Sequence, residues 1–367
     1  MAEEKHGFLE RGRRRSGVAS RILGWTALLA VVGLAAACGG GDSEPSAGDG
    51  GTQEAQSGGD GAGPDQVSVR LGWIQKEEYA FLYSGVEKGF FAENGIDLVI
   101  NLGEGSLSSM ELVNRGADEF GYTGGPSFFI AAAEGMDLKM LALMLQKNPS
   151  NLLSWPDTPV NDLQDLEGKR FLLTVGDAFS ALWPSVAADA GIDRSKIDER
   201  NVGQSSQLQA FVAHRGDVTP SFATSSHSQL EEAAGVEFNV VNVADLGYNI
   251  VSNGIFTRTE LIEENPDLVR RFVAAAVKSW DWTAENVEEA SEIMSEHLSD
   301  VELDSIVETV RATTELAHTE NTVGEPTGWM AREDWESSLD LMKKGGLLEG
   351  EVNIDEMYTN DFLPESK

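Results

Sequence analysis

The chain has 367 residues, 41% of them hydrophobic, and a formal net charge of −34. Its length allows one or more globular domains with sizeable cores. This acidity disfavours binding to nucleic acid or to anionic lipid headgroups, because a strongly negative surface repels phosphate groups.

The first 37 residues have the layout of a secretory signal. Five arginines, from Arg11 to Arg21, precede the apolar run Ile22–Ala37, and Cys38 follows directly. A cysteine after small residues resembles the bacterial lipobox, in which the thiol receives a diacylglyceryl group. We therefore expect residues 1–37 to be a lipoprotein signal peptide and Cys38 to be lipidated, on the outer face of the cell membrane.

Two other interpretations of this segment stay open. One is an ordinary signal cleaved after Ala37, and the other is a membrane anchor, although the apolar run is shorter than the roughly 20 residues that span a bilayer. The export route is also open, because Arg14-Arg15 could belong to a twin-arginine signal but Ser16-Gly17 follows where apolar residues are expected. Cys38 is the only cysteine, so the fold has no internal disulfide and needs a large core.

Residues 38–66 are predicted to be the lipidated cysteine and a disordered linker. Residues 39–65 are mostly Gly, Ser, Asp and Glu with almost no aliphatic side chains, which cannot repay the entropy of ordering. A flexible coil of about 27 residues spans on the order of 30 Å. We expect this segment to tether the folded part to a membrane.

From residue 67 onward, strand and helix patterns alternate. The β-branched or apolar runs predict strands over Val67–Leu71, Ile96–Leu102, Phe120–Thr123 and Leu138–Leu145. Helices are expected between them, over Glu78–Lys88, from a capping box at Ser108-Ser109-Met110-Glu111 to Gly116, and over Ser127–Glu134. Such alternation predicts a parallel sheet with helices on both faces.

The same alternation restarts at Phe171–Val175 and predicts a second α/β lobe. Its further strands are expected near Val218–Phe222 and Phe238–Val243, and its helices over Ser180–Ala190, Gln207–His214 and Ser226–Ala234. The remainder is mostly helical, with Pro266 at a helix start. One apolar stripe on that helix consists of Val269, Phe272, Val273, Ala276 and Trp280.

Several short motifs, taken in their order and spacing, resemble one protein family. They are Gly72-Trp73, Tyr79, Glu87-Lys88-Gly89-Phe90-Phe91, Asn94-Gly95-Ile96-Asp97, Asp165-Leu166-Glu167-Gly168-Lys169-Arg170 and Tyr358-Thr359-Asn360-Asp361-Phe362-Leu363-Pro364. They resemble the substrate-binding proteins of ABC importers for nitrate, sulfonates, taurine and thiamine pyrimidine precursors, a family that includes riboflavin binders. The resemblance spans nearly all of residues 67–364.

The resemblance implies an α/β, two-lobe periplasmic-binding-protein fold of type II-like clamp form. Each lobe would be a mostly parallel sheet flanked by helices, with the ligand cleft between the lobes. Crossovers are expected at about Asn151–Pro159 and Gly247–Phe256. The first lobe would comprise residues 67–155, the second residues 156–255, and residues 256–367 would return to the first lobe and add the C-terminal helices.

The candidate ligand-binding residues come from the loops that follow strands, because ligands of open parallel sheets bind beyond the carboxyl ends of the strands. They are Trp73, Gln75, Tyr79, Glu104, Tyr122, Thr123, Asp177, Phe179, Ser180, Trp183, Gln204, Ser205, Phe222, Thr224 and Asn249.

The chemistry of these candidates favours a flat, weakly polar ligand. The aromatic rings supply stacking faces, and the hydroxyl and amide groups supply hydrogen bonds. The set contains no Lys or Arg, which disfavours nitrate and phosphate, although the helix starts at Ser106 and Ser180 could hold a sulfonate. Core packing is the alternative role for Tyr79 and Trp183, and helix capping is the alternative for Asp177.

A catalytic interpretation has little support in the sequence. No His lies in an activated pattern, and no nucleophile elbow, zinc motif or phosphate loop is present. Enzymes of the same fold that synthesise the pyrimidine use a cysteine-rich motif, whereas Cys38 is the only cysteine here. Acid pairs such as Glu77-Glu78 and Glu263-Glu264 are expected to be solvated helix charges. We therefore expect no catalytic residue, no metal and no cofactor.

The function predicted from the sequence is that of an extracytoplasmic, monomeric solute-binding protein. It would capture a small aromatic or heteroaromatic nutrient, either a thiamine pyrimidine precursor or a riboflavin-like compound, and deliver it to an ABC permease and ATPase complex. The alternatives are a sulfonate or taurine carrier and an extracellular enzyme of the same fold.

Overall fold

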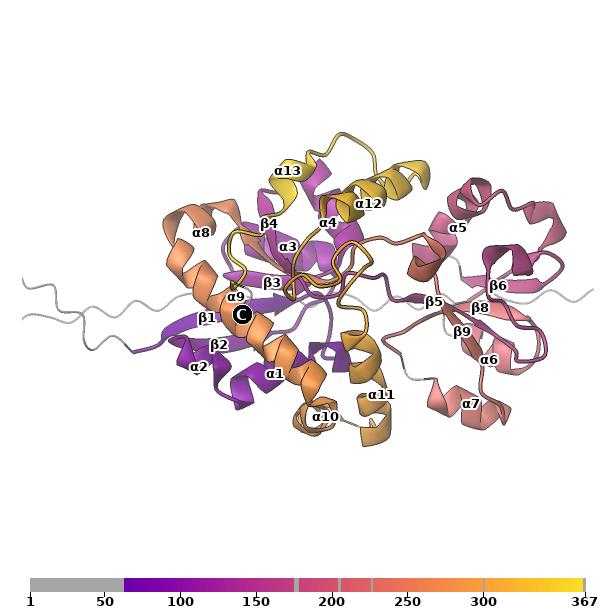
Figure 1. Cartoon of the computed structure of the whole chain (residues 1–367), viewed down its shortest axis with the longest axis horizontal. Coiled ribbons are helices and arrows are strands. Elements are labelled where there is room, and N and C mark those ends of the chain that lie inside the picture. Colours follow the sequence, from indigo (N-terminus) through magenta and orange to yellow (C-terminus); the bar gives the residue numbers. More distant parts are fainter. Residues whose placement is uncertain (1–62, 175–177, 204–205, 226, 300, 366–367) are drawn as a thin grey trace, which may run out of the picture. The chain divides into compact units, whose positions relative to one another are not determined.

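The computed structural model describes residues 63–174, 178–203, 206–225, 227–299 and 301–365 (Figure 1). The expected signal peptide, Cys38 and almost all of the linker lie outside these residues, as do the site candidates Asp177, Gln204 and Ser205. Within the described residues, no helix combines the length and the apolar character needed to cross a membrane.

The first sheet has the strand order β2-β1-β3-β10-β4. Its strands are β1 Asp65–Leu71, β2 Ile96–Asn101, β3 Phe120–Thr123, β4 Leu138–Leu143 and β10 Gly254–Arg258. β1 pairs in parallel with β2 and β3, whereas β10 runs antiparallel to both β3 and β4. Four strands therefore share one direction, and the four strands predicted for this lobe are confirmed.

Helices cover both faces of the first sheet (Figure 1). One face packs against α1 Ala80–Glu87, α2 Phe90–Glu93 and α9 Pro266–Glu285. The other face packs against α3 Ser106–Asn114, α4 Gly125–Ala133, α12 Arg332–Lys344 and α13 Ile354–Met357. Neighbouring residues of β10 show the division, because Ile255 belongs to the first core and Phe256 to the second.

The long helix α9 confirms the predicted apolar stripe. Asn265 caps it by accepting a hydrogen bond from the Leu268 backbone N–H, and Pro266 occupies its first turn. All five stripe residues are buried, and the Phe272 ring stacks on Phe120 of β3 with centroids 3.7 Å apart. The short helix α8 Thr259–Glu264 leads into α9, while α10 Val287–Ser295 and α11 Leu303–Thr314 form a smaller core together with Ala80.

The second sheet has the strand order β7-β6-β8-β5-β9. Its strands are β5 Ser150–Ser154, β6 Arg170–Thr174, β7 Asp198–Val202, β8 Val218–Phe222 and β9 Asn239–Asn242. β6 is parallel to β7 and β8, whereas β5 is antiparallel to β8 and β9. One face packs against α5 Ala178–Asp189, and the other packs against α6 Gln207–Val212 and α7 Ser228–Ala234.

Residues 150–154 differ from the expected connection between the lobes. Ser150–Ser154 is a strand of the second sheet, so the chain leaves the first sheet after Leu143, earlier than position 155, and the expected crossover at Asn151–Pro159 is wrong. All five residues of β5 are buried, so the segment shows no alternation, and its polar ends followed by Pro156 are typical of a loop. The range expected for the return crossover, Gly247–Phe256, overlaps the start of β10, because that strand begins at Gly254.

Strand β7 was not predicted, and helix α3 begins earlier than expected. The polar edge strand Asp198–Val202 has only half-buried and exposed residues, so it gave no hydrophobic signal. The helix α3 begins at Ser106 and not at a capping box, because Gly105 adopts a φ of 148°, which favours glycine, and occupies the cap position. The Ser108 hydroxyl instead donates to the Gly105 carbonyl at 2.9 Å.

Candidate ligand-binding site

The carboxyl ends of β1 and β3 lie side by side and bring three loops together. Leu71 pairs with Tyr122 in the sheet register, and a Cβ on Gly72 would lie only 2.3 Å from Thr123 Oγ1. Only glycine permits this approach. The Trp73 carbonyl then accepts a hydrogen bond from the Gly103 N–H at 3.0 Å, which joins the loop after β2 to the same place.

Trp73 is the first-lobe aromatic candidate whose ring is available to a ligand. Its side chain is 47% exposed, whereas Tyr79 and Tyr122 are 2% and 0% exposed. The two tyrosine rings meet edge to face at 5.8 Å within the first core. The alternative role predicted for Tyr79, packing in the core, agrees with this placement.

Glu78 is a polar residue of this region that the sequence interpretation did not select. Its carboxylate accepts a hydrogen bond from Asn253 Nδ2 at 3.2 Å and another from the Tyr79 phenol. Burial raises the pKa of Glu78, and the nearby Lys76 charge partly opposes that effect. Glu78 is thus not the solvated helix charge expected of the Glu77-Glu78 pair.

The Tyr122 hydroxyl lies near Glu78 and has no hydrogen-bond partner among the described residues. Burial raises the pKa of Tyr122 well above its ordinary value, and the Glu78 charge adds to the rise. Buried hydroxyls nearly always find a partner, so an unpaired one marks a place that water or a ligand can complete. The only sequence signal for this cluster is the position of Glu78 just before a buried tyrosine.

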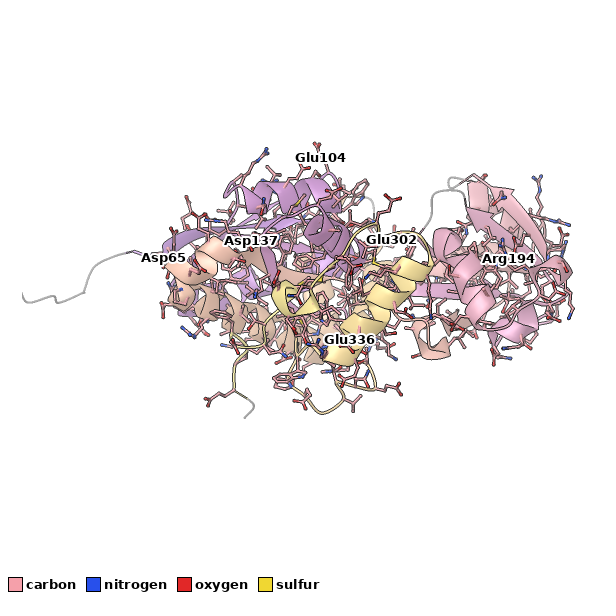
Figure 2. The ribbon with its side chains drawn as sticks, turned by 90° about the horizontal axis from the view of Figure 1, so that it is seen from above. Asp65, Glu104, Asp137, Arg194, Glu302 and Glu336 are labelled. Atoms are coloured by element: carbon pink, nitrogen blue, oxygen red, sulfur yellow. The ribbon has the colours of Figure 1, made fainter. Side chains whose placement is uncertain are left out.

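The remaining first-lobe candidates differ in accessibility. Thr123 is buried against Gly72, and Gln75 is half-buried in the loop after β1. Glu104 is exposed and projects away from the ribbon (Figure 2). Lys76, which was not among the candidates, is exposed in the same loop as Gln75 and is a basic group next to the cluster.

The aromatic candidates at the start of the second lobe are core residues. Phe179 and Trp183 lie one turn apart on α5, both are buried, and their rings stack at 6.2 Å. Trp183 also donates from Nε1 to Glu199 Oε1 at 2.7 Å, which satisfies its polar atom. Packing accounts for both rings, while Ser180 between them is half-buried.

The carboxyl end of β8 carries the exposed ring of the second lobe. Phe222 is 41% exposed at the last position of the strand, and Thr224 follows it half-buried. The Ala223 N–H donates to the Pro149 carbonyl at 2.7 Å, and its side chain packs against the first core. Each lobe therefore exposes one aromatic ring, Trp73 or Phe222, where a sheet strand ends.

Asn249 joins the two crossovers to each other. Its Oδ1 accepts from the Asn148 N–H at 2.7 Å, and its Nδ2 donates to the Gln146 carbonyl at 2.9 Å. Gln146 is buried and donates in turn to the Trp329 carbonyl at 2.8 Å. Both ends of the Asn249 amide are thus occupied by backbone, which fixes the two crossovers to each other.

The His227 backbone N–H donates to Glu308 Oε1 at 3.0 Å, and burial lowers the pKa of the His227 imidazole. Among the described residues, no cluster of three or more His, Cys, Asp or Glu side chains could hold a metal ion.

Comparison with known proteins identifies relatives over most of the chain. The family described as NMT1/THI5 like matches residues 76–290. The riboflavin-binding protein RibY of Chloroflexus aurantiacus is 26% identical over 306 residues, covering 82% of this chain and 86% of that protein. The formylaminopyrimidine-binding protein of Halalkalibacterium halodurans is 23% identical and covers 81% and 90%.

One relative is named as an enzyme. The 4-amino-5-hydroxymethyl-2-methylpyrimidine phosphate synthase of Legionella pneumophila is 23% identical, over 82% of this chain and 93% of that protein. Among solved structures, the aliphatic sulphonate-binding protein SsuA of Escherichia coli matches with a TM-score of 0.60 and 14% identity, over 83% of this chain and 95% of that one. This likeness confirms the predicted periplasmic-binding-protein fold.

Proposed function

Because the chain belongs to the NMT1/THI5-like family, we propose that it is the solute-binding component of an ABC importer and that it captures a small, flat heteroaromatic nutrient. Relatives named for binding riboflavin and formylaminopyrimidine support this role and this ligand class. The permease and ATPase complex of the importer would receive the ligand from the closed protein.

The observation that carries the ligand class is the exposed ring at each strand end. Trp73 and Phe222 are exposed apolar rings in a protein whose other candidate rings are buried. Aromatic faces of this kind stack on flat ligands, and each such contact is worth roughly 0.5–1.5 kcal/mol beyond area burial. Core packing does not account for either ring.

A sulfonate or taurine ligand is the second candidate, and the first-lobe chemistry argues against it. The half-buried Glu78 carboxylate lies in the connection that follows Trp73, and its charge repels an anion. Lys76 is exposed beside it, and the start of α3 at Ser106 offers backbone donors. Lys76 and the start of α3 do not offset the negative charge of Glu78 with the positive charge that an anionic ligand needs.

We propose further that the protein releases its ligand unchanged. A relative is named as a synthase, so relatives of this chain include an enzyme. The chain has a single cysteine, at position 38, and therefore has no cysteine-rich motif. Recovery of intact ligand from a stoichiometric complex supports a carrier, whereas loss of ligand mass with time identifies an enzyme.

The site of action follows from the N-terminal sequence. Residues 1–37 would direct export, and Cys38 would carry the lipid that holds the protein on the outer face of the membrane. Cys38→Ser, expressed in a bacterial host that processes lipoproteins, should release soluble protein. Retention of the variant in the membrane with its leader uncut would support a membrane anchor instead.

The test of the proposed function is direct binding. The chain from residue 39 onward, purified without denaturation, should bind riboflavin or 4-amino-5-hydroxymethyl-2-methylpyrimidine in isothermal titration and should not bind taurine. Binding should also stabilise the folded protein by mass action, by about 2.7 kcal/mol at a ligand concentration one hundred times the dissociation constant, and this stabilisation should raise the melting temperature. Binding of taurine alone would replace the heteroaromatic proposal with the sulfonate one.

A further inference from the structure

We infer that Glu78 is the residue that determines ligand specificity in this site, and that it selects a heterocycle with a hydrogen-bond donor on its edge. This inference rests on the proposed function and names the chemistry of the ligand more closely. The ligand edge would place an N–H or amino group against the carboxylate, as an aminopyrimidine or a cyclic imide does.

The position of Glu78 is fixed by three separate segments of the chain. It lies in the single turn Glu77–Tyr79 that follows the β1 loop and leads into α1. Its partner Asn253 comes from the end of the return crossover and precedes Gly254, which pairs with Thr123 of β3. The Asn253 carbonyl also accepts hydrogen bonds from the Met144 and Leu145 N–H groups, so the amide is held in place.

The carboxylate is under-satisfied in this position. An ionised carboxylate offers about four acceptor sites, and Asn253 and Tyr79 occupy two of them. Among the ion pairs of the described residues, none includes Glu78. A half-buried carboxylate outside any ion pair loses part of its hydration, so its presence is understandable where a ligand supplies the missing donor.

The Tyr122 hydroxyl is an independent sign of the same polar edge. It is fully buried beside Glu78 and lacks a partner in the described part of the chain. A hydroxyl can donate to a ring nitrogen or carbonyl that lies next to the ligand donor, either directly or through one water molecule. Glu78 and Tyr122 together therefore suit a ligand edge on which a donor and an acceptor are neighbours.

The stacking ring and the carboxylate both lie in the connection between β1 and α1. Trp73 is exposed just after β1, and Glu78, which follows in the turn Glu77–Tyr79, is half-buried. A flat ligand that stacks on the indole can therefore present its edge to Glu78, which combines an apolar face with one directional polar contact. Pockets for small molecules commonly have this composition.

Substitution of Glu78 gives the decisive experiment, and Glu77 provides a matched control. Glu78→Gln removes the charge and one acceptor, and Glu77→Gln removes the same charge one position away. In isothermal titration at pH 7 with riboflavin and with 4-amino-5-hydroxymethyl-2-methylpyrimidine, we expect Glu78→Gln to weaken the bound heterocycle at least tenfold. We expect Glu77→Gln to change it less than threefold, and Glu78→Asp to fall between the two.

The pH dependence of binding adds a readout that a purely structural role would not produce. The groups facing Glu78 are Lys76, Glu77, Tyr79 and Tyr122, and burial raises the pKa values of both tyrosines away from neutrality. Affinity of the wild type should therefore rise with pH as Glu78 ionises, and this rise should be absent in Glu78→Gln. Melting curves of the unliganded variants check that each one folds.

The outcomes separate this inference from the proposed function. If the wild type binds neither heterocycle, the proposed ligand class fails and the inference fails with it. If the wild type binds a heterocycle and the folded Glu78→Gln variant binds it equally well at every pH, the inference alone is overturned. An equal loss of affinity in Glu77→Gln and Glu78→Gln would also overturn it, because general electrostatics would then explain both.

Discussion

The two lobes share one topology and differ in what they place at the ends of their strands. In each sheet the strand that follows a crossover runs antiparallel to its neighbours: β10 lies beside β3 in the first sheet, and β5 lies beside β8 in the second. In the first lobe the connection after β1 carries the exposed Trp73 and the half-buried Glu78, whereas in the second lobe the start of α5 turns Phe179 and Trp183 into the core. The same strand arrangement thus supports two different half-sites.

This difference teaches that strand-end position alone does not make a residue part of a site. Trp73 lies in a loop, where its side chain stays 47% exposed, while Trp183 lies within a helix whose inner face meets the sheet. Helical periodicity brings residues 179, 183 and 187 to that inner face, since residues four apart share one side. The contrast between the two tryptophans can be tested directly.

The largest expected effect is on stability and comes from Trp183→Ala. This substitution removes a fully buried indole that packs edge to face against Phe171 at 5.3 Å. Truncation of such a side chain costs about 3–5 kcal/mol. Urea unfolding of the unliganded protein should show this loss. Trp73→Ala should change the free energy of unfolding by no more than about 0.5 kcal/mol, as exposed positions do, and equal losses in the two variants would contradict the comparison.

The residue that joins the two crossovers should have the next largest effect. Asn249→Ala leaves the Asn148 N–H and the Gln146 carbonyl without their partners. An unsatisfied buried polar group costs about 1–3 kcal/mol. We expect a lower melting temperature together with weaker ligand binding, because the crossovers connect both half-sites. Weaker binding at unchanged stability would instead favour direct ligand contact by Asn249.

The exposed rings should affect binding while leaving stability unchanged. Trp73→Ala should weaken a heteroaromatic ligand at least tenfold, which corresponds to about 1.4 kcal/mol. Trp73→Phe keeps a stacking face and should retain most of the affinity. Phe222→Ala tests the ring of the second lobe in the same titration. If Phe222→Ala has no effect and Trp73→Ala does, only the first lobe supplies a stacking face.

The smallest expected effect concerns two ion pairs that occupy equivalent positions in the two lobes. Arg70 of β1 pairs with Asp118 just before β3, and Arg170 of β6 pairs with Asp217 just before β8. The hydrogen bond from Arg170 lowers the pKa of Asp217, so its contribution to stability is present above about pH 4 and is lost as the pH falls through the lowered value. Because Arg170 is partly exposed, we expect Asp217→Asn to cost about 1 kcal/mol or less at pH 7.

The pH profile of unfolding is the measurement for this pair. The stability gap between the wild type and Asp217→Asn should close below pH 4, since protonation then removes the pair from the wild type as well. Asp118→Asn serves as the comparison, because the Asp118 side chain is fully buried and accepts from Arg70 and Asn101 at 2.8 and 2.7 Å. It should cost more than Asp217→Asn, and the reverse order would contradict the burial difference.

Local sequence patterns were sufficient for most of the elements. The β-branched runs of β1 and β2, the glycines that end the early helices and the stripe on α9 are all visible within about twenty residues of chain. The order of short motifs was sufficient for the family, and the family for the fold. The exposure of Trp73 was also foreseeable, because a residue just beyond a strand end has few neighbours in sequence that can cover it.

What the sequence alone could not determine depends on contacts between distant segments. The strands β5 and β10 each lie between partner strands that are distant in the sequence. Strand β7 is polar because it forms the edge of its sheet. Glu78 is partly covered because Tyr79, Tyr122 and Asn253 come together around it, from positions up to 175 residues apart. Periodicity reports the environment of a single element, whereas the environment of a carboxylate depends on everything that packs around it, so only the tertiary structure could show that this acid is partly covered.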